Sequence, residues 1–353
     1  MTGDTRGRFT GARLQLVERL FPEGIPELWC PPLTHFSDDG TLDAARIRAH
    51  LRSMRPWVRG FLVPGSTGEG WELPDAQVRE LLALAIDEVG AARGHLLIGI
   101  LKTTGPEAIR GVRETLAWLR ARTGAQEPLE ALARSSVCGF TVCPPSGSEL
   151  TQEEIRGALA GVLSLGAPIA LYQLPQVTRN EMSPETVAAL ADGYSNFYLL
   201  KDTSGADRVA ASGFRGAFLV RGAEGEYATH LVGSGGKYDG FLLSTANCFG
   251  RELAQLVADV HRGNREAAEA FSARLTALCD ELFDLGAKIG FGNPFTNANK
   301  AMDHYFAFGP GAADVPPPRL CSGRRLPRDL VDAAGAALER HGLMPRRGYL
   351  EQA

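Results

Sequence analysis

Lysine is scarce in this chain, and one lysine stands where an amine could do covalent chemistry. Five of the 37 basic residues are lysines. Lys201 closes the apolar run 197–200, which has the length of a buried strand. Burial among apolar neighbours disfavours the charged form of an amine and so populates the neutral form, which can attack a carbonyl carbon. The pattern predicts a nucleophile at Lys201; the alternative is a structural ion pair with Asp202 or another carboxylate at a strand end.

A glycine-rich loop offers a place for an anion. Residues 65–69 read Gly-Ser-Thr-Gly-Glu and follow another short apolar run. The glycines allow backbone N–H groups to turn toward a bound carboxylate. The alternative is that Ser66 and Thr67 cap the next helix. Glu69 is expected to brace the loop rather than to take part in chemistry.

The elements that would position these groups alternate along the chain. Short apolar runs, typical of strands, lie at residues 27–31, 58–64, 95–101, 139–143, 168–172, 197–201, 217–222 and 238–243. Stretches with helical periodicity lie between them, at residues 43–57, 74–89, 107–120, 151–163, 184–191 and 226–232. Eight such repeats predict an α/β fold, a (β/α)8 TIM barrel with a C-terminal helical extension. Tyr172 and Lys201 would then end neighbouring strands on the face where these barrels carry their chemistry.

The predicted domains follow from where this alternation begins and stops. Residues 1–24 form a leading segment with a helix at 13–20, residues 25–250 form the barrel, and residues 251–353 form the helical extension. Within the extension, helices are predicted at 251–261, 265–285 and 330–341. The connection 121–137 is longer than usual and is predicted to carry a short extra helix.

Composition excludes several classes of function. The net charge is −4 and neither sign forms long blocks, which argues against nucleic acid and anionic membranes as partners. No apolar run approaches the ~20 residues of a membrane span, and residues 1–13 lack the apolar core of a signal peptide, so we expect a cytoplasmic protein. The six cysteines form no CxxC pair and the seven histidines no HxxxH pair, so neither a disulfide framework nor a metal site is expected.

Several ordered motifs together resemble one family, the dihydrodipicolinate synthase / N-acetylneuraminate lyase family of class I, Schiff-base-forming aldolases. The resemblance covers nearly the whole chain. Its motifs are Asp39-Gly40 with Asp43, the loop 65–69, Tyr172, Lys201 followed by Asp-Thr-Ser-Gly, residues 240–247, and Asn293-Pro294 with Lys300.

The resemblance implies a role for each site residue. Lys201 would form the Schiff base with a pyruvate-like 2-oxo acid, and Tyr172 would carry protons. Ser66 and Thr67 would bind the carboxylate, with Ser66 also in the proton relay. Gly222 and Leu242 would line the pyruvate pocket. The alternative for Tyr172 is a core aromatic whose hydroxyl bonds to a backbone carbonyl. No cofactor or metal is implied, and family members often assemble as homo-oligomers, frequently tetramers.

Two departures from the family pattern bear on the substrate. Synthases of the family carry an arginine five residues after the catalytic tyrosine, where this chain has Val177; Arg179 lies two residues further on. A tyrosine pair expected after the fourth strand is replaced by Cys-Pro-Pro-Ser-Gly at 143–147. We therefore expect an aldolase or dehydratase that cleaves a 2-oxo-3-deoxy sugar acid or related compound and releases pyruvate, with an aldehyde as second partner. The alternatives are 4-hydroxy-tetrahydrodipicolinate synthase, using aspartate semialdehyde, and a non-catalytic barrel that binds a 2-oxo acid.

Overall fold

The predicted barrel is confirmed. A computed structural model describes residues 8–352, so residues 1–7 of the predicted leading segment lie outside the described part. The strands follow one another around a closed barrel in the order β1 to β8, and the pairs are parallel. Their bounds are β1 Leu28–Cys30, β2 Gly60–Val63, β3 His95–Ile100, β4 Val137–Val142, β5 Ile169–Gln173, β6 Phe197–Asp202, β7 Phe218–Arg221 and β8 Gly240–Leu242.

Helices connect the strands and continue after β8. The α-helices are α1 Gly11–Leu20, α2 Ala44–Met54, α3 Asp75–Ala91, α4 Gly105–Thr123, α5 Pro128–Arg134, α6 Gln152–Leu163, α7 Pro175–Thr178, α8 Pro184–Gly193, α9 Arg208–Ala211, α10 Tyr227–His230, α11 Ala246–Arg262, α12 Arg265–Ala287, α13 Pro294–Phe308 and α14 Arg328–Arg340. Short 3-10 turns are η1 Val232–Ser234, η2 Pro310–Asp314 and η3 Tyr349–Gln352. The predicted extra helix is confirmed as α5, whereas α13 was not predicted.

Contacts divide the described chain into two compact units. The first unit comprises residues 8–28, 95–223 and 230–242, and the second comprises residues 29–94, 224–229 and 243–352. The predicted boundaries at residues 24 and 250 stay predictions. No helix in the described part of the chain is both long and apolar enough to cross a membrane.

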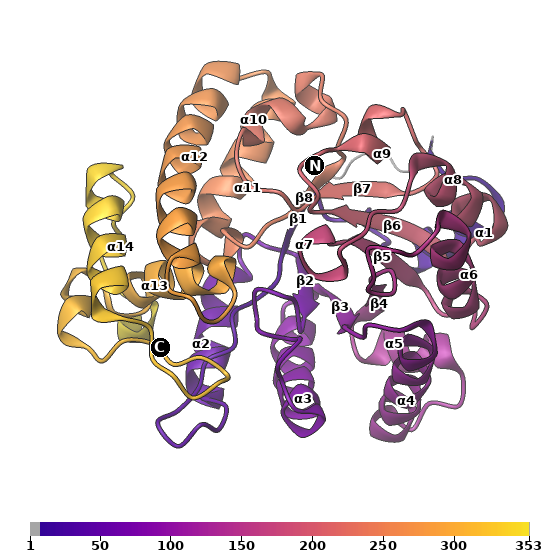
Figure 1. The fold of residues 1–353 in the computed structure, drawn as a ribbon, viewed down its shortest axis with the longest axis horizontal. Coiled ribbons are helices and arrows are strands. Elements are labelled where there is room, and N and C mark those ends of the chain that lie inside the picture. The colour runs from indigo at the N-terminus through magenta and orange to yellow at the C-terminus, as the bar shows by residue number, and fades with distance from the viewer. Residues whose placement is uncertain (1–7, 353) are drawn as a thin grey trace. The chain divides into compact units, whose positions relative to one another are not determined.

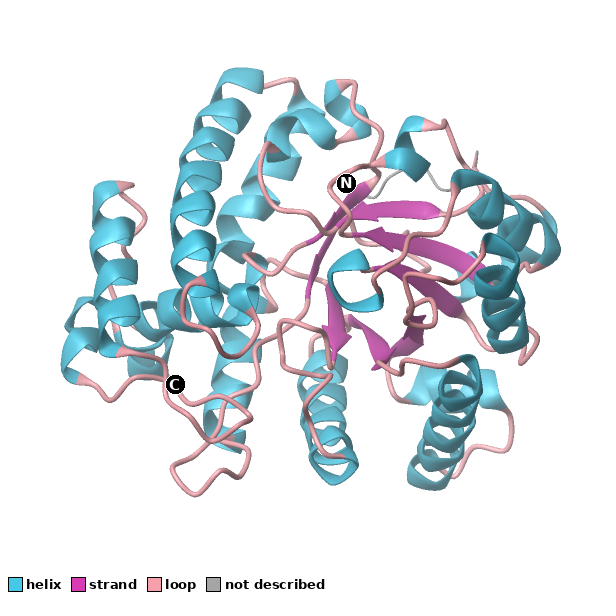
Figure 2. Cartoon of the chain, in the orientation of Figure 1, coloured by secondary structure: helices cyan, strands magenta, loops and turns pink. Residues whose placement is uncertain are grey.

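In the first unit, neighbouring parallel strands bring the ends of β5, β6 and β7 together. All residues of β4 to β7 are buried, as expected for strands with an apolar environment on both faces. The register pairs Tyr172 with Lys201, and Lys201 with Val220. These strands run side by side in Figure 2. A side chain at the end of β5 is therefore adjacent to one at the end of β6.

In the second unit, the helical extension packs around α13. This helix contacts α11, α12 and α14, and Figure 1 shows α12 and α14 with α13 between their lower ends. Asn293 caps α13: its side chain accepts a hydrogen bond from Phe295 N at 2.9 Å, and Pro294 is the first residue of the helix. Eleven of its residues are buried, polar ones among them, so it lacks the one-sided apolar pattern that predicts a surface helix.

Candidate active site

Lys201 lies buried near the end of β6 and faces an aromatic ring. Its side chain is 3% exposed, and its Nζ lies 4.0 Å from the centroid of the Tyr172 ring. Among the residues that the structure describes, no carboxylate forms an ion pair with this ammonium. The amine therefore meets a π-face rather than a fixed negative charge.

Asp202 does not pair with Lys201, so the ion-pair alternative is wrong. Its carboxylate accepts hydrogen bonds from Ser204 N at 2.9 Å and from the Tyr238 hydroxyl at 3.3 Å. Burial raises the pKa of Asp202 above its ordinary value, and the hydrogen bonds from Ser204 oppose this shift. The carboxylate of Asp202 thus stabilises the turn after β6 and does not bind the amine of Lys201.

Tyr172 reaches Lys201, as its position on the neighbouring strand predicted. The side chain is 2% exposed. Within the described residues, its hydroxyl makes no hydrogen bond to a backbone carbonyl, in contrast to Tyr198, whose hydroxyl donates to Cys138 O at 3.0 Å. The phenol of Tyr172 is therefore not committed to a structural role in the way that the alternative requires.

Gly222 leaves the space that the lysine needs. It follows β7, and a Cβ added there would lie 2.8 Å from Lys201 Cε and 2.3 Å from Thr203 Cγ2, both too short. Leu242 ends β8 and is 1% exposed. On another side, burial raises the pKa of the Cys143 thiol to about 12, with the nearby charge of Lys201 opposing the shift. The groups of the first unit that lie near the amine, Tyr172, Gly222 and Cys143, thus include no carboxylate.

The loop 65–69 belongs to the second unit and follows β2. Ser66 and Thr67 are buried there, and Trp71 Nε1 donates a hydrogen bond to Ser66 Oγ at 2.9 Å. Helix α3 begins at Asp75 with Pro74 as its cap. The alternative that Ser66 and Thr67 cap this helix is therefore wrong.

Neighbouring segments bind the backbone carbonyls of this loop. The Thr34 hydroxyl donates to Gly68 O at 2.6 Å, and the Thr296 hydroxyl donates to Thr67 O at 3.0 Å. A side chain at Gly68 would come within 2.5 Å of Pro32 O. Glu69 forms a buried ion pair with Lys300, in agreement with its expected bracing role. Nothing in the local sequence around Thr34, Thr296 and Lys300 predicts their contacts with this loop.

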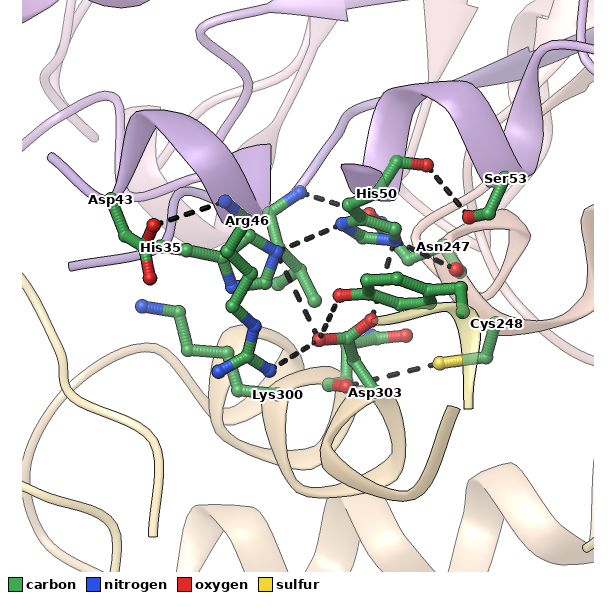
Figure 3. A network of polar contacts seen from close by, with 12 residues as sticks. His35, Asp43, Arg46, His50, Ser53, Asn247, Cys248, Lys300 and Asp303 are labelled. Carbon is green, nitrogen blue, oxygen red and sulfur yellow. Dashed lines mark hydrogen bonds and ion pairs between the residues drawn. The ribbon is translucent and has the colours of Figure 1, made fainter. Parts of the chain in front are cut away.

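A separate cluster in the second unit has side chains of the types that bind metals. Nitrogen and oxygen atoms of His35, His50 and Asp303 lie within 4.8 Å of one another, and all three residues are buried. Other groups already bind the Asp303 carboxylate. Arg46 Nη2 lies 2.9 Å from Asp303 Oδ2 (Figure 3). The Tyr349 hydroxyl lies 3.3 Å from the same oxygen. The Tyr349 ring also stacks on His50, with ring centroids 5.2 Å apart.

The two imidazoles of this cluster form a hydrogen-bonded relay. His50 Nε2 donates to Asn247 O at 3.0 Å, because a carbonyl can only accept, and His50 Nδ1 lies 2.9 Å from His35 Nε2. Burial lowers the pKa of His35 well below its ordinary value, and the charges of Arg46, His50 and Lys300 lower it further. We assign the group as a hydrogen-bonded structural cluster, because a cation there would face the guanidinium of Arg46.

Comparisons with known proteins bear on the assignment of this site. The model of the dihydrodipicolinate synthetase family matches residues 119–293. A curated 4-hydroxy-tetrahydrodipicolinate synthase of Xanthomonas axonopodis pv. citri is 32% identical over 250 residues, which are 69% of this chain and 75% of that protein. The chain belongs to the dihydrodipicolinate synthase family. The resemblance read from the sequence motifs is thereby confirmed, as is membership in a group of class I lyases and aldolases.

Solved structures of the dihydrodipicolinate synthase family share the fold. A prophage protein of this family from Escherichia coli, solved with pyruvate, matches with a TM-score of 0.69 at 20% identity, over 91% of this chain and 100% of that chain. A 2-keto-3-deoxygluconate aldolase from Sulfolobus matches with a TM-score of 0.65 at 16% identity, over 89% of this chain and 96% of that chain. At these identities the likeness establishes the barrel alone, so the substrate must be argued from the residues.

Proposed function

We propose that this chain is a Schiff-base lyase that cleaves a 2-oxo-3-deoxy sugar acid, or a related compound, and releases pyruvate, with Lys201 as the nucleophile. The observation that carries the proposal is the environment of Lys201, a buried amine that faces the ring of Tyr172 and has no ion-paired carboxylate among the described residues. Such an amine needs little desolvation before it attacks a carbonyl carbon.

The reaction can be written with this chain's own residues. Lys201 Nζ attacks C2 of the 2-oxo acid, and Tyr172 donates its phenolic proton to the hydroxyl that departs as water, which gives an iminium and a phenolate. The iminium draws the electrons of the C3–C4 bond as the phenolate of Tyr172 takes the proton of the C4 hydroxyl, which releases an aldehyde and leaves an enamine. Protonation at C3 and hydrolysis of the iminium then release pyruvate and restore the amine. Ser66 and Thr67 are proposed to bind the substrate carboxylate. Gly222 and Leu242 are proposed to line the space around the pyruvate carbons. No cofactor takes part.

The preference for a sugar acid over aspartate semialdehyde rests on two segments. The segment 143–147 contains no tyrosine, and Val177 stands in place of the arginine that would hold a second carboxylate. Arg179 follows α7 with a left-handed backbone and an exposed side chain. A substrate that ends in hydroxyl groups needs no such arginine. Assembly as a homo-oligomer and a cytoplasmic location stay predictions.

One second function has a specific observation in its favour. Several relatives at 26–32% identity are named 4-hydroxy-tetrahydrodipicolinate synthase. Condensation of pyruvate with aspartate semialdehyde would use the same Lys201 iminium, so the two candidates differ only in the second substrate. Assays of pyruvate release from a panel of 2-oxo-3-deoxy sugar acids, alongside condensation assays with the semialdehyde, separate them.

The nucleophile is tested by trapping. The protein is incubated with pyruvate and borohydride, and the intact mass and the modified peptide are determined. We expect a single reduced adduct on Lys201, absent from Lys201→Ala. A wild-type protein that gains no adduct would favour the non-catalytic barrel, whereas an adduct on Lys201→Ala would overturn the assignment of the nucleophile.

A further inference from the structure

Two hydroxyls of the loop 65–69 are available to a ligand. Trp71 Nε1 donates to Ser66 Oγ at 2.9 Å, which leaves the hydroxyl hydrogen of Ser66 free to donate elsewhere. The Thr67 hydroxyl forms no hydrogen bond within the described part of the chain, although the residue is only 6% exposed. If the proposed function holds, both donors would serve the substrate carboxylate, and their direction depends on what fixes the loop backbone.

Helix α13 binds the backbone of these two residues. The Thr296 hydroxyl lies 3.0 Å from Thr67 O and 3.4 Å from Ser66 O. Thr296 itself is 0% exposed, so water cannot replace it as a donor. One buried hydroxyl thus holds the two consecutive carbonyls on the side of α13.

One turn later, the same helix binds the end of the loop. Lys300 lies four positions after Thr296, on the same face of the helix, and forms an ion pair with Glu69. Lys300 is 1% exposed and also donates to Arg319 O at 2.7 Å, while the other oxygen of Glu69 accepts from Cys321 N at 2.7 Å. The pair therefore ties the loop both to α13 and to the segment that follows it.

The backbone at Glu69 needs this support. Its φ of 59° lies in the left-handed region, which is unfavourable for a residue with a side chain by roughly 1 kcal/mol or more. Both members of a buried ion pair lose their water, so moving one away from the other leaves a buried charge without a partner and is costly. The ion pair can hold Glu69 in this conformation and so define the path of the loop.

We propose that Thr296 and Lys300 are positioning residues for the substrate carboxylate, so that the C-terminal helical extension forms part of the catalytic apparatus. They touch the loop and not the substrate. Their loss is therefore expected to weaken recognition of the carboxylate group in particular, not Schiff-base chemistry in general. This proposal rests on the function proposed above.

The test compares two ketones that differ in the carboxylate. Borohydride trapping is measured against the concentration of pyruvate and of methyl pyruvate, whose ester carries no charge. The wild type is expected to saturate at lower concentrations of pyruvate than of the ester. Thr296→Val, which removes the hydroxyl at nearly constant volume, should raise the half-saturating concentration of pyruvate about two- to tenfold and leave that of the ester unchanged. Thr296→Ser should restore the preference.

Two further variants make the outcome decisive. Glu69→Gln/Lys300→Met removes both charges of the pair and should reduce the preference for pyruvate at least as much as Thr296→Val does. Asn297→Leu is the matched control, because Asn297 lies on the same buried helix but its amide donates to Phe291 O and Gly286 O. It should lower stability and keep the preference.

The possible failures are distinguishable. A wild type without any adduct overturns the proposed function and this inference with it. A wild type that is trapped, with an unchanged ratio of the two half-saturating concentrations in Thr296→Val and in the double variant, overturns the positioning role alone. An equal change of the ratio in Asn297→Leu would also overturn it, because the effect would then follow from general destabilisation of α13.

Discussion

Two lysines of this protein are almost equally buried, yet their surroundings differ completely. Lys201 is 3% exposed and Lys300 is 1% exposed, and each ammonium lies near an aromatic ring, at 4.0 Å from the Tyr172 centroid and 4.8 Å from the Phe36 centroid. Lys300 also has a carboxylate and a carbonyl as partners, whereas Lys201 forms neither an ion pair nor a hydrogen bond with the described residues. Burial alone therefore does not distinguish the proposed nucleophile from Lys300, but the absence of a paired carboxylate does.

The two buried amines also differ in the charges that surround them. Around Lys300, desolvation lowers the pKa of the amine and Glu69 opposes that shift, so the charge is kept for structure. Around Lys201 the strand residues of β5 and β6 are buried, and Asp202 of β6 accepts hydrogen bonds from Ser204 and Tyr238 rather than pairing with the amine. At Lys300, charge fixes the geometry of the loop through Glu69. At Lys201, the amine has no ion pair and is proposed to form a covalent bond.

The largest expected effect concerns the hydroxyl of Tyr172, whose ring faces Lys201. Tyr172→Phe keeps the ring and removes the phenolic proton carrier, so we expect kcat to fall by about 10²- to 10⁴-fold while the borohydride adduct with pyruvate still forms. Steady-state kinetics and trapping on the same preparation measure both. Tyr198→Phe is the matched control, because it removes a buried phenol that donates to Cys138 O and should change stability only. Unchanged turnover in Tyr172→Phe would mean that another group carries the proton.

The next effect compares the two lysines directly. Lys300→Met leaves Glu69 buried without its partner, and loss of one member of a buried ion pair lowers the free energy of unfolding by about 3–5 kcal/mol. Lys201→Met replaces an amine that has no ion pair, and we expect a change within about 1 kcal/mol or a gain. Urea unfolding followed by circular dichroism measures both variants. Equal losses would contradict the distinction drawn between the two environments.

The smallest expected effect is a pH dependence of the free energy of unfolding, caused by His35 near Lys300. His35 has a folded-state pKa well below its ordinary value of 6.5, so the unfolded chain binds the proton first as the pH falls. The free energy of unfolding should therefore decrease below about pH 6.5, by up to about 1.4 kcal/mol per pH unit, until the folded-state pKa is reached. Urea midpoints at pH 7.5, 6.0 and 5.0 measure this slope, and His35→Gln should flatten it. An identical slope in that variant would assign the acid sensitivity to other groups.

Much of the fold could be predicted because the barrel strands are short, apolar and regularly spaced. Strand ends were accurate enough to place Tyr172, Lys201, Gly222 and Leu242, since each follows or closes an apolar run. The helix start at Thr151 was also correct, and the structure shows a full capping box with Glu154. The predicted strand 58–64 was too long, because β2 spans only Gly60–Val63.

The rest could not be read from local patterns. α13 was missed because it is buried on most sides and carries Asn297, Asn299 and Lys300 inside, so neither its periodicity nor its polarity predicts a core helix. The pair of Glu69 and Lys300 joins residues 231 positions apart, and no spacing rule connects such positions. The roles of Ser66, Thr67, Tyr172 and Lys201 stay proposals until substrates are tested.

The stacked ring of Tyr349 has a practical consequence for recombinant versions of this enzyme. The ring lies parallel to His50, with an interplanar angle of 3°, and its hydroxyl bonds to Asp303. Shortening the chain before this residue would hydrate the imidazole relay, although every group assigned to chemistry would remain.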